Sequence, residues 1–306
     1  MEMIRTENLT KKYGDLTAVD SLTLSVNEGE VFGLLGPNGA GKTTTVRMLC
    51  CLISSTSGSA MIKGLNVSDR EDSMKIRKMI GIVHDNVGLY ETLSAYENLE
   101  FFGKMYEFPE DRLKQNIEKY LKMLDMWDQR NQPVASFSKG MKQKVALARA
   151  LLHEPELIFM DEPTANLDPE AAKVIRNVIL DLKKENRTIF LNTHNLDEAQ
   201  RICDRIGVLK TRLIAVDSPE SLERAVSQKR TTFVLAEVNN KVVEAVQGMS
   251  PKSLEVQGNS LVVELMDPEK DMPGIVDAIV SAGGKIKSVS QVGATLEDVY
   301  LKLVRE

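Results

Sequence analysis

The stretch Gly36-Pro-Asn-Gly-Ala-Gly-Lys-Thr-Thr44 decides how the rest of the chain is interpreted. It fits the pattern G-x-x-x-x-G-K-[ST], in which the backbone N–H groups of a glycine-rich loop surround the phosphates of a nucleotide. The apolar run Val31 to Leu35 precedes it as a predicted buried strand, and the helix-compatible run Thr43 to Leu52 follows it. This order of strand, loop and helix predicts a triphosphate-binding loop, to which the helix N-terminus adds a positive dipole end.

Two side chains of this loop have separate expected roles. Lys42 supplies a positive charge for the β- and γ-phosphates and is also a candidate catalytic residue. Thr43 supplies a hydroxyl oxygen for Mg²⁺. The whole loop is expected to bind the nucleotide, through Gly36, Pro37, Asn38, Gly39, Ala40, Gly41, Lys42, Thr43 and Thr44.

Length, composition and charge limit the possible classes of protein. The chain has 306 residues, enough for about two domains, and its 42% hydrophobic and 27% charged residues are ordinary for a soluble globular protein. The net charge of −5 does not favour a polyanion, so no nucleic acid is expected as a partner. No apolar run approaches the ~18 residues of a membrane span. If the protein works at a membrane, we expect another chain to supply the span.

Strands and helices alternate through the first two thirds of the chain, which predicts a mostly parallel sheet. Strands are expected over 31–35, 60–63, 80–83, 157–161 and 188–191, with helices over 43–52, 140–152, 169–184 and 196–203. An N-terminal antiparallel β part is predicted from the alternating segments 3–9 and 18–26, with a turn over 11–15. A helical insert is predicted within 94–152, because Ser94-Ala-Tyr-Glu97 fits a capping box. Its next helix has an apolar face made of Leu113, Ile117, Tyr120, Leu121 and Leu124.

The composition changes after Pro219, so we predict domains over 1–220 and 221–306. In the second domain the expected strands are 231–238, 253–257, 260–266 and 285–292, with helices over 240–246, 273–282 and 296–304. This order of elements predicts a small ferredoxin-like α+β domain. It contains no His, Cys or clustered carboxylates, so association or regulation is its expected role.

Two acids and a histidine are predicted to meet at the carboxyl edge of the sheet, where open α/β sheets bind ligands. Asp161 ends a buried strand and is expected to hold Mg²⁺, directly or through water. Glu162 is expected to polarise a water for attack on the γ-phosphate. His194 follows the strand 188–191 and is expected to fix that water and the γ-phosphate. The alternatives are that Asp161 and Glu162 lie in a solvated acidic turn, and that His194 has no partner.

Residues 1 to about 220 resemble the ATPase domain of ATP-binding-cassette (ABC) proteins. The resemblance rests on motifs that occur in the family's order: the phosphate loop, Phe137-Ser-Lys-Gly-Met-Lys-Gln143, Met160-Asp-Glu-Pro163, Asn166-Leu-Asp168 and His194. From physics alone, Ser138 would be an ordinary helix N-cap. The resemblance implies instead that Ser138 and Gly140 contact the γ-phosphate of an ATP bound by a second subunit.

The same resemblance implies a head-to-tail dimer with two ATP molecules at its interface and Mg²⁺ beside each. Asp168 would couple the two sites. Tyr13 stands where the family places an aromatic ring that stacks on adenine, and a plain surface aromatic is the alternative.

The sequence departs from the family pattern in two places. The signature usually reads Leu-Ser-Gly-Gly-Gln, and here Lys139 and Met141 replace a Gly and the Gln. This variant is similar to the daunorubicin-exporter type, which often has a C-terminal extension containing a phrase like Thr295-Leu-Glu-Asp-Val-Tyr300. The family also places a Gln that binds Mg²⁺ after the strand 80–83. Asp85 stands there, and we expect its carboxylate to remain a metal ligand.

The expected fold is therefore an α/β P-loop NTPase domain followed by the α+β domain. The expected function is that of an ATP-hydrolysing subunit of an ABC exporter, which drives a separate transmembrane permease from the cytoplasmic face of the membrane. Leu89, Tyr90 and the helix 94–106 are candidates to receive the permease. Two alternatives stay open. A soluble ABC ATPase acting on nucleic acid or ribosomes is disfavoured by the negative charge and the lack of a long coiled coil. A nucleotide-gated module without hydrolysis is disfavoured by Glu162 and His194.

Overall fold

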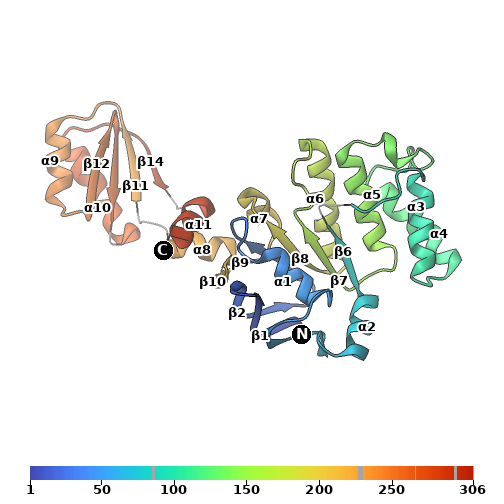
Figure 1. The fold of residues 1–306 in the computed structure, drawn as a ribbon. Helices are drawn as coiled ribbons and strands as arrows, with labels where there is room; N and C mark the ends of the chain where they lie inside the picture. The colour runs from blue at the N-terminus through green and yellow to red at the C-terminus, as the bar shows by residue number, and fades with distance from the viewer. Residues whose placement is uncertain (85–86, 227–229, 266, 293–294, 306) are drawn as a thin grey trace. The chain divides into compact units, whose positions relative to one another are not determined.

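The computed structural model describes residues 1–84, 87–226, 230–265, 267–292 and 295–305 (Figure 1). The chain forms two compact units, Met1–Pro219 and Glu220–Glu306.

A six-stranded sheet lies at the centre of the first unit, in the order β10-β9-β3-β8-β7-β6. Every residue of its three middle strands, β3 (Val31–Leu35), β8 (Thr188–Thr193) and β7 (Leu157–Asp161), is buried. These strands pair in parallel with one another, with β6 (Ile80–Val83) and with β9 (Arg205–Lys210). Strand β10 (Arg212–Asp217) pairs antiparallel with β9. The predicted mostly parallel sheet is confirmed, and its continuous apolar strands have the character of a sheet that is covered on both faces.

Helices connect the parallel strands and lead into the site. Helix α1 (Lys42–Leu49) follows β3, α6 (Pro169–Lys184) follows β7, and α7 (Leu196–Ile202) follows β8. Helix α1 ends three residues earlier than predicted, where Cys51 takes a left-handed φ of 57°. Helix α2 (Arg70–Met79), which was not predicted, begins at the N-cap Asp69.

The second sheet of this unit is antiparallel, in the order β2-β1-β4-β5. Its strands are β1 (Glu2–Tyr13), β2 (Leu16–Asn27), β4 (Ser57–Ile62) and β5 (Leu65–Asn66). The predicted turn over 11–15 is wrong, because Lys11 and Lys12 still pair with Val19 and Thr17, and Tyr13 pairs with Leu16. The turn is confined to Gly14 and Asp15. Tyr13 therefore ends a strand.

The helical insert contains α3 (Ala95–Met105), α4 (Glu110–Met123) and α5 (Lys139–Leu151). The predicted capping box is confirmed: the Glu97 N–H donates to Ser94 Oγ at 3.1 Å, and the Ser94 N–H donates to Glu97 Oε2 at 2.8 Å. The predicted apolar face of α4 is also confirmed, since all of its members are buried. Helix α5 brings Ser138, at its N-cap, toward α6.

The second unit has the predicted order of strands and helices. Its strands β11 (Arg230–Leu235), β12 (Ser253–Gln257), β13 (Ser260–Glu264) and β14 (Ile286–Val292) form an antiparallel sheet in the order β12-β13-β11-β14, which is the ferredoxin-like arrangement. Helices α9 (Asn240–Gly248) and α10 (Pro268–Ser281) share one core with β11 and β13, including Phe233, Leu261 and Val246. Helix α10 starts at Pro268 and includes Pro273, the predicted start. Helix α8 (Pro219–Val226), which was not predicted, leads into this unit, and α11 (Leu296–Arg305) ends it.

Candidate functional site

Close backbone approaches shape the loop between β3 and α1. A Cβ atom at Gly36 would lie 2.3 Å from the carbonyl oxygen of Leu209, and one at Gly41 would lie 2.3 Å from that of Ala18. Gly41 also has a φ of +100°, which side chains rarely adopt. Glycine is therefore required at both positions. The resulting loop conformation leaves its backbone free of side chains where a phosphate would approach.

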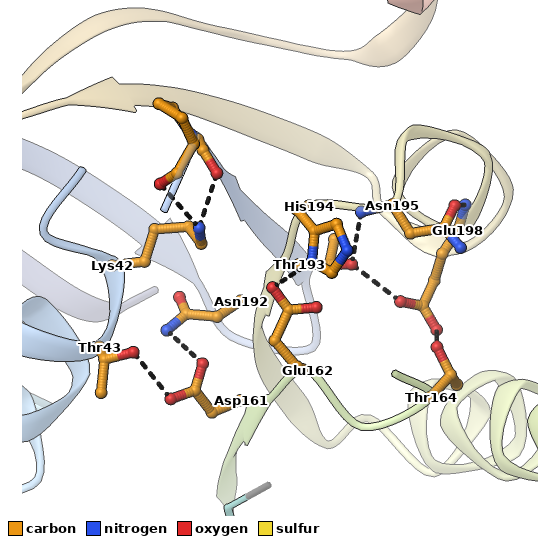
Figure 2. A network of polar contacts seen from close by, with 12 residues as sticks. Lys42, Thr43, Asp161, Glu162, Thr164, Asn192, Thr193, His194, Asn195 and Glu198 are labelled. Atoms are coloured by element: carbon orange, nitrogen blue, oxygen red, sulfur yellow. Dashed lines mark hydrogen bonds and ion pairs between the residues drawn. The ribbon is translucent and has the colours of Figure 1, made fainter. Parts of the chain in front are cut away.

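Lys42 places a buried cation against this loop. Its Nζ donates to the carbonyl oxygens of Gly36 at 2.6 Å and Pro37 at 3.2 Å (Figure 2). Burial lowers the pKa of this ammonium group, while the nearby Glu162 and Asp161 raise it. The side chain therefore lies folded over the loop, with its charge available to an anionic ligand.

Asp161 and Thr43 place two oxygen atoms side by side. Thr43 Oγ1 donates to Asp161 Oδ2 at 3.0 Å, and Asn192 Nδ2 donates to Asp161 Oδ1 at 3.2 Å (Figure 2). A hydroxyl and a carboxylate are ligands that Mg²⁺ prefers, and the ion usually takes its remaining ligands from phosphates and water. One hydroxyl and one carboxylate side by side fit that use.

Glu162 and His194 meet at the same edge of the sheet, as their places after neighbouring strands predicted. His194 Nδ1 lies 2.7 Å from Glu162 Oε1 (Figure 2). The Glu162 backbone has a left-handed φ of 51°, and its N–H donates to the Asn192 carbonyl oxygen at 2.9 Å. This uncommon conformation is held by the neighbouring strand. An acid and an imidazole are thus paired beside Lys42 and Asp161.

Glu198, which the sequence reasoning missed, connects the loop after β7 to the carboxyl end of β8. The side chain is 2% exposed and accepts hydrogen bonds from Thr164 Oγ1 at 2.7 Å and Thr193 Oγ1 at 3.0 Å (Figure 2). Burial raises the pKa of this carboxyl group, and the two hydroxyl bonds act in the opposite direction. An acid in the first turn of a helix is ordinary in sequence. Only the three-dimensional structure shows that Glu198 links Thr164 to Thr193.

A cavity of about 440 Å³ lies over the phosphate loop. It is lined by Tyr13, Leu16, Ala18, residues 37–44, Asp161 and Glu162. Tyr13 is 48% exposed, and the Lys11 ammonium lies 5.1 Å from the centre of its ring. The structure thus brings the predicted aromatic, loop, metal-ligand and acid residues around one space, which we call the nucleotide cavity.

Ser138, Gly140 and Asp168 lie together outside the lining of the nucleotide cavity. Ser138 Oγ accepts a hydrogen bond from the Met141 N–H at 3.2 Å, and Asp168 Oδ1 accepts one from the Ala171 N–H at 2.8 Å. A Cβ atom at Gly140 would lie 3.3 Å from Asp168 Oδ2 and 2.8 Å from the Ala171 Cβ. Two helix N-termini therefore meet here, at α5 and α6. Asp85, the remaining predicted metal ligand, lies outside the described residues.

A separate apolar cavity of about 470 Å³ lies between the central sheet and the helical insert. Its lining from the insert includes Phe102, Met105, Tyr106 and Arg149, and its lining from the core includes Leu52, Ile82 and His84. Leu89 and Tyr90 are not among the described lining residues, although the Tyr90 ring lies 5.9 Å from that of Phe102. Of the predicted permease-facing segments, α3 lines this groove directly.

The comparisons with known proteins agree with this geometry. The profile of the ABC transporter family matches residues 19–165. The chain is 34% identical to the bacitracin transport ATP-binding protein of Bacillus licheniformis over 303 residues, covering 99% of this chain and 97% of that protein. It is 31% identical to a daunorubicin resistance ATP-binding protein of Streptomyces coeruleorubidus over 306 residues, covering 98% and 94%.

Similar solved structures also belong to ABC transporters. An ABC transporter subunit of Clostridium perfringens matches with a TM-score of 0.67 and 29% identity, over 74% of this chain and 94% of that one. A dimeric ATP-binding cassette in a post-hydrolysis state, bound to ADP and phosphate, matches with a TM-score of 0.64 and 29% identity, over 71% and 98%. In the described part of the chain, no helix has the length and apolar character to cross a membrane. The expected fold class and ATPase function are confirmed, and neither alternative function gains support: the chain belongs to the ATP-binding, ATP-hydrolysing subunits of ABC transporters.

Proposed function

We propose that this chain is the ATPase subunit that drives an exporter. ATP binding closes two copies of the chain, and hydrolysis reopens them. The observation that carries the proposal is the convergence of Lys42, Asp161, Glu162 and His194 at one sheet edge, beside the phosphate loop (Figure 2). Relatives named for bacitracin transport, daunorubicin resistance and Nod factor export support the direction of transport.

Each residue has a defined task in hydrolysis. The Lys42 ammonium exchanges its bonds to loop carbonyls for bonds to the β- and γ-phosphates. Glu162 uses the carboxylate oxygen that is not bonded to His194 to accept a proton from the attacking water. The His194 imidazole orients Glu162 and the γ-phosphate. The reaction is a phosphoryl transfer to water, governed by positioning and electrostatics.

Mg²⁺ belongs to this proposal as the second cofactor. Thr43 and Asp161 would hold it, and when bound it would neutralise charge on the phosphates. Asp85 is proposed as a further ligand. Its test is Asp85→Ala, for which we expect a lower ATPase rate and a higher Mg²⁺ requirement. Unchanged values for both would show that Asp85 has no such role.

The signature residues support a head-to-tail dimer. Ser138 and Gly140 lie outside the lining of their own nucleotide cavity, so a contact with phosphate would have to be made to a second copy of the chain. Asp168 adjoins Gly140 and would couple the two sites. The dimeric state of a solved relative supports this assembly.

A transmembrane permease would supply the path for the substrate and hold this chain at the cytoplasmic face of the membrane. The groove between the central sheet and α3 is apolar and rimmed by exposed Met105, Tyr106 and Leu52. Such a groove suits a helix with an apolar face. Co-purification of the chain with a multi-span protein from membranes tests this contact.

The decisive experiment compares the ATPase turnover of the wild type and Glu162→Gln in the presence of the permease. Loss of the proton acceptor is expected to lower kcat by about 10²-fold or more while ATP still binds. Glu170→Gln is the matched control, because Glu170 is an exposed acid in the first turn of α6 and does not line the nucleotide cavity. The proposal is wrong if the wild type does not turn over ATP even with its permease present.

A further inference from the structure

A third cavity, of about 330 Å³, adjoins the nucleotide cavity. The two share Asn38 and Glu162, so they meet beside the proposed catalytic acid. We call the smaller space the side chamber. Its polar lining consists of Asn38, Lys139, Gln143, Glu162, Asn166 and His194.

Nitrogen donors dominate this lining. Lys139 Nζ donates one hydrogen to the Ala165 carbonyl oxygen at 3.2 Å, which leaves two of its three N–H bonds for a ligand. His194 is bonded to Glu162 through Nδ1, which leaves Nε2 for the chamber. The amides of Asn38 and Asn166 add further N–H groups at its exposed rim. The chamber therefore offers one fixed positive charge and several donors to a small ligand rich in acceptors.

Gln143 gives independent support for such a ligand. The residue is 2% exposed, and within the described ranges its side-chain nitrogen Nε2 has no hydrogen-bond partner. A buried N–H group without an acceptor costs free energy, and native proteins rarely leave one unpaired. Because Gln143 lines the chamber, an oxygen of a bound ligand can supply the missing acceptor.

We propose that the side chamber is a transient binding site for inorganic phosphate, the product of hydrolysis. This inference rests on the proposed role of Glu162. After attack, the bond between the γ-phosphorus and the bridging oxygen has broken, a bond to the water oxygen has formed, and Glu162 holds the water's proton. ADP and phosphate are then both anions and repel each other.

The chamber relieves that repulsion. Phosphate moves past Asn38 and Glu162 toward the Lys139 ammonium, and the protonated Glu162 carboxyl donates a hydrogen bond to it. The family's signature usually has glycine at position 139, so the charge is a feature of this chain's variant signature. Lys139 therefore acts within its own subunit, on the product, while Ser138 and Gly140 act on the nucleotide of the partner.

The test is a titration of the full chain, saturated with ADP, with inorganic phosphate as the probe, followed by ³¹P NMR. Lys139→Gly installs the family's usual residue and is expected to weaken phosphate binding about tenfold, the typical effect of one charge-assisted hydrogen bond. Gln143→Leu removes the buried donor and is expected to weaken it about threefold. Lys142→Ala is the matched control, because it removes the same charge from α5 but Lys142 pairs with Glu91 at 2.6 Å.

Binding of ATP is measured in parallel for every variant. The proposal stands if Lys139→Gly weakens phosphate binding but leaves ATP affinity within twofold. It is overturned if Lys139→Gly and the wild type bind phosphate equally, if Lys142→Ala has the same effect as Lys139→Gly, or if ATP affinity falls as much as phosphate affinity. The titration requires no turnover, so its failure is distinct from a failure of the wild type to hydrolyse ATP.

Discussion

The central sheet of the first unit is mostly parallel, whereas the sheet of the second unit is antiparallel. In the 1–219 unit, β3, β7 and β8 run in parallel, and each leads at its carboxyl end into residues of the candidate site. In the 220–306 unit, each paired strand is antiparallel to its neighbours. Consecutive strand ends in an antiparallel sheet lie at opposite edges, so no single edge collects them.

The difference explains why chemistry is concentrated in one unit. Lys42, Asp161 and His194 are far apart in sequence, and the shared direction of three strands brings them together. The second unit has a buried core of its own around Phe233 and Leu261, but its sequence contains no His or Cys. Three predictions test this contrast.

The largest expected effect comes from Lys42→Ala. Loss of the ammonium that lies over the phosphate loop is expected to lower kcat/KM for ATP by about 10³-fold, as for other groups that stabilise transferring phosphates. Steady-state ATPase assays measure it. Lys252→Ala in the second unit is the control, because Lys252 is an exposed lysine whose partner is Glu264, and neither residue lines the nucleotide cavity. Equal losses in the two variants would contradict the contrast.

A matched pair of core substitutions separates stability from activity. Leu191→Ala in β8 and Leu261→Ala in β13 each open a cavity at a fully buried site and are expected to destabilise their own unit by about 3 kcal/mol. Leu191→Ala should also lower ATPase activity, since β8 carries Asn192 and leads to His194. Leu261→Ala should leave it within about twofold, because its site has a separate core. Calorimetry and ATPase assays measure both, and loss of activity in Leu261→Ala would show that the second unit supports catalysis.

The smallest effect is expected from Glu198→Gln, and it depends on pH. Burial raises the pKa of Glu198 above its usual value of 4.5. The folded protein therefore holds this proton more tightly than the unfolded chain does. The contribution of this group to the free energy of unfolding therefore falls as pH rises through the folded pKa. The wild type should lose more stability than Glu198→Gln as the pH rises above 4.5. Parallel pH profiles of the thermal midpoint would refute it.

The elements predicted well from sequence are those with strong local patterns. Strands β3, β6 and β7 are short apolar runs with polar ends, and α6 has Asp168 as N-cap and Pro169 in its first turn. The missed elements lack such patterns. Helix α2 buries one residue, Ile76, so it shows no periodic apolar face. Strands β9 and β10 are separated by Thr211 alone, which has a left-handed φ of 64°. A single threonine is not one of the residue pairs that predict a tight hairpin turn from sequence.

The residues of the candidate site also divide into those that the sequence predicts and those that it does not. Asp161, Glu162 and His194 were predictable because strand ends specify an edge of the sheet. Asn192 and Glu198 were not, because their partners lie on other strands and loops, and pairing of Asp161 with Asn192 depends on the register of β7 and β8. The side chamber required spatial knowledge too, since nothing in sequence places Lys139 beside Ala165.

The contact that excludes a side chain at Gly36 has a genetic consequence. The obstructing atom is the backbone carbonyl oxygen of Leu209, which every amino acid possesses. A smaller side chain at position 209 therefore creates no room, and no exchange there can suppress a Gly36 substitution by removing the obstruction. In a collection of functional variants, position 36 should stay glycine while position 209 accepts any residue compatible with a buried strand.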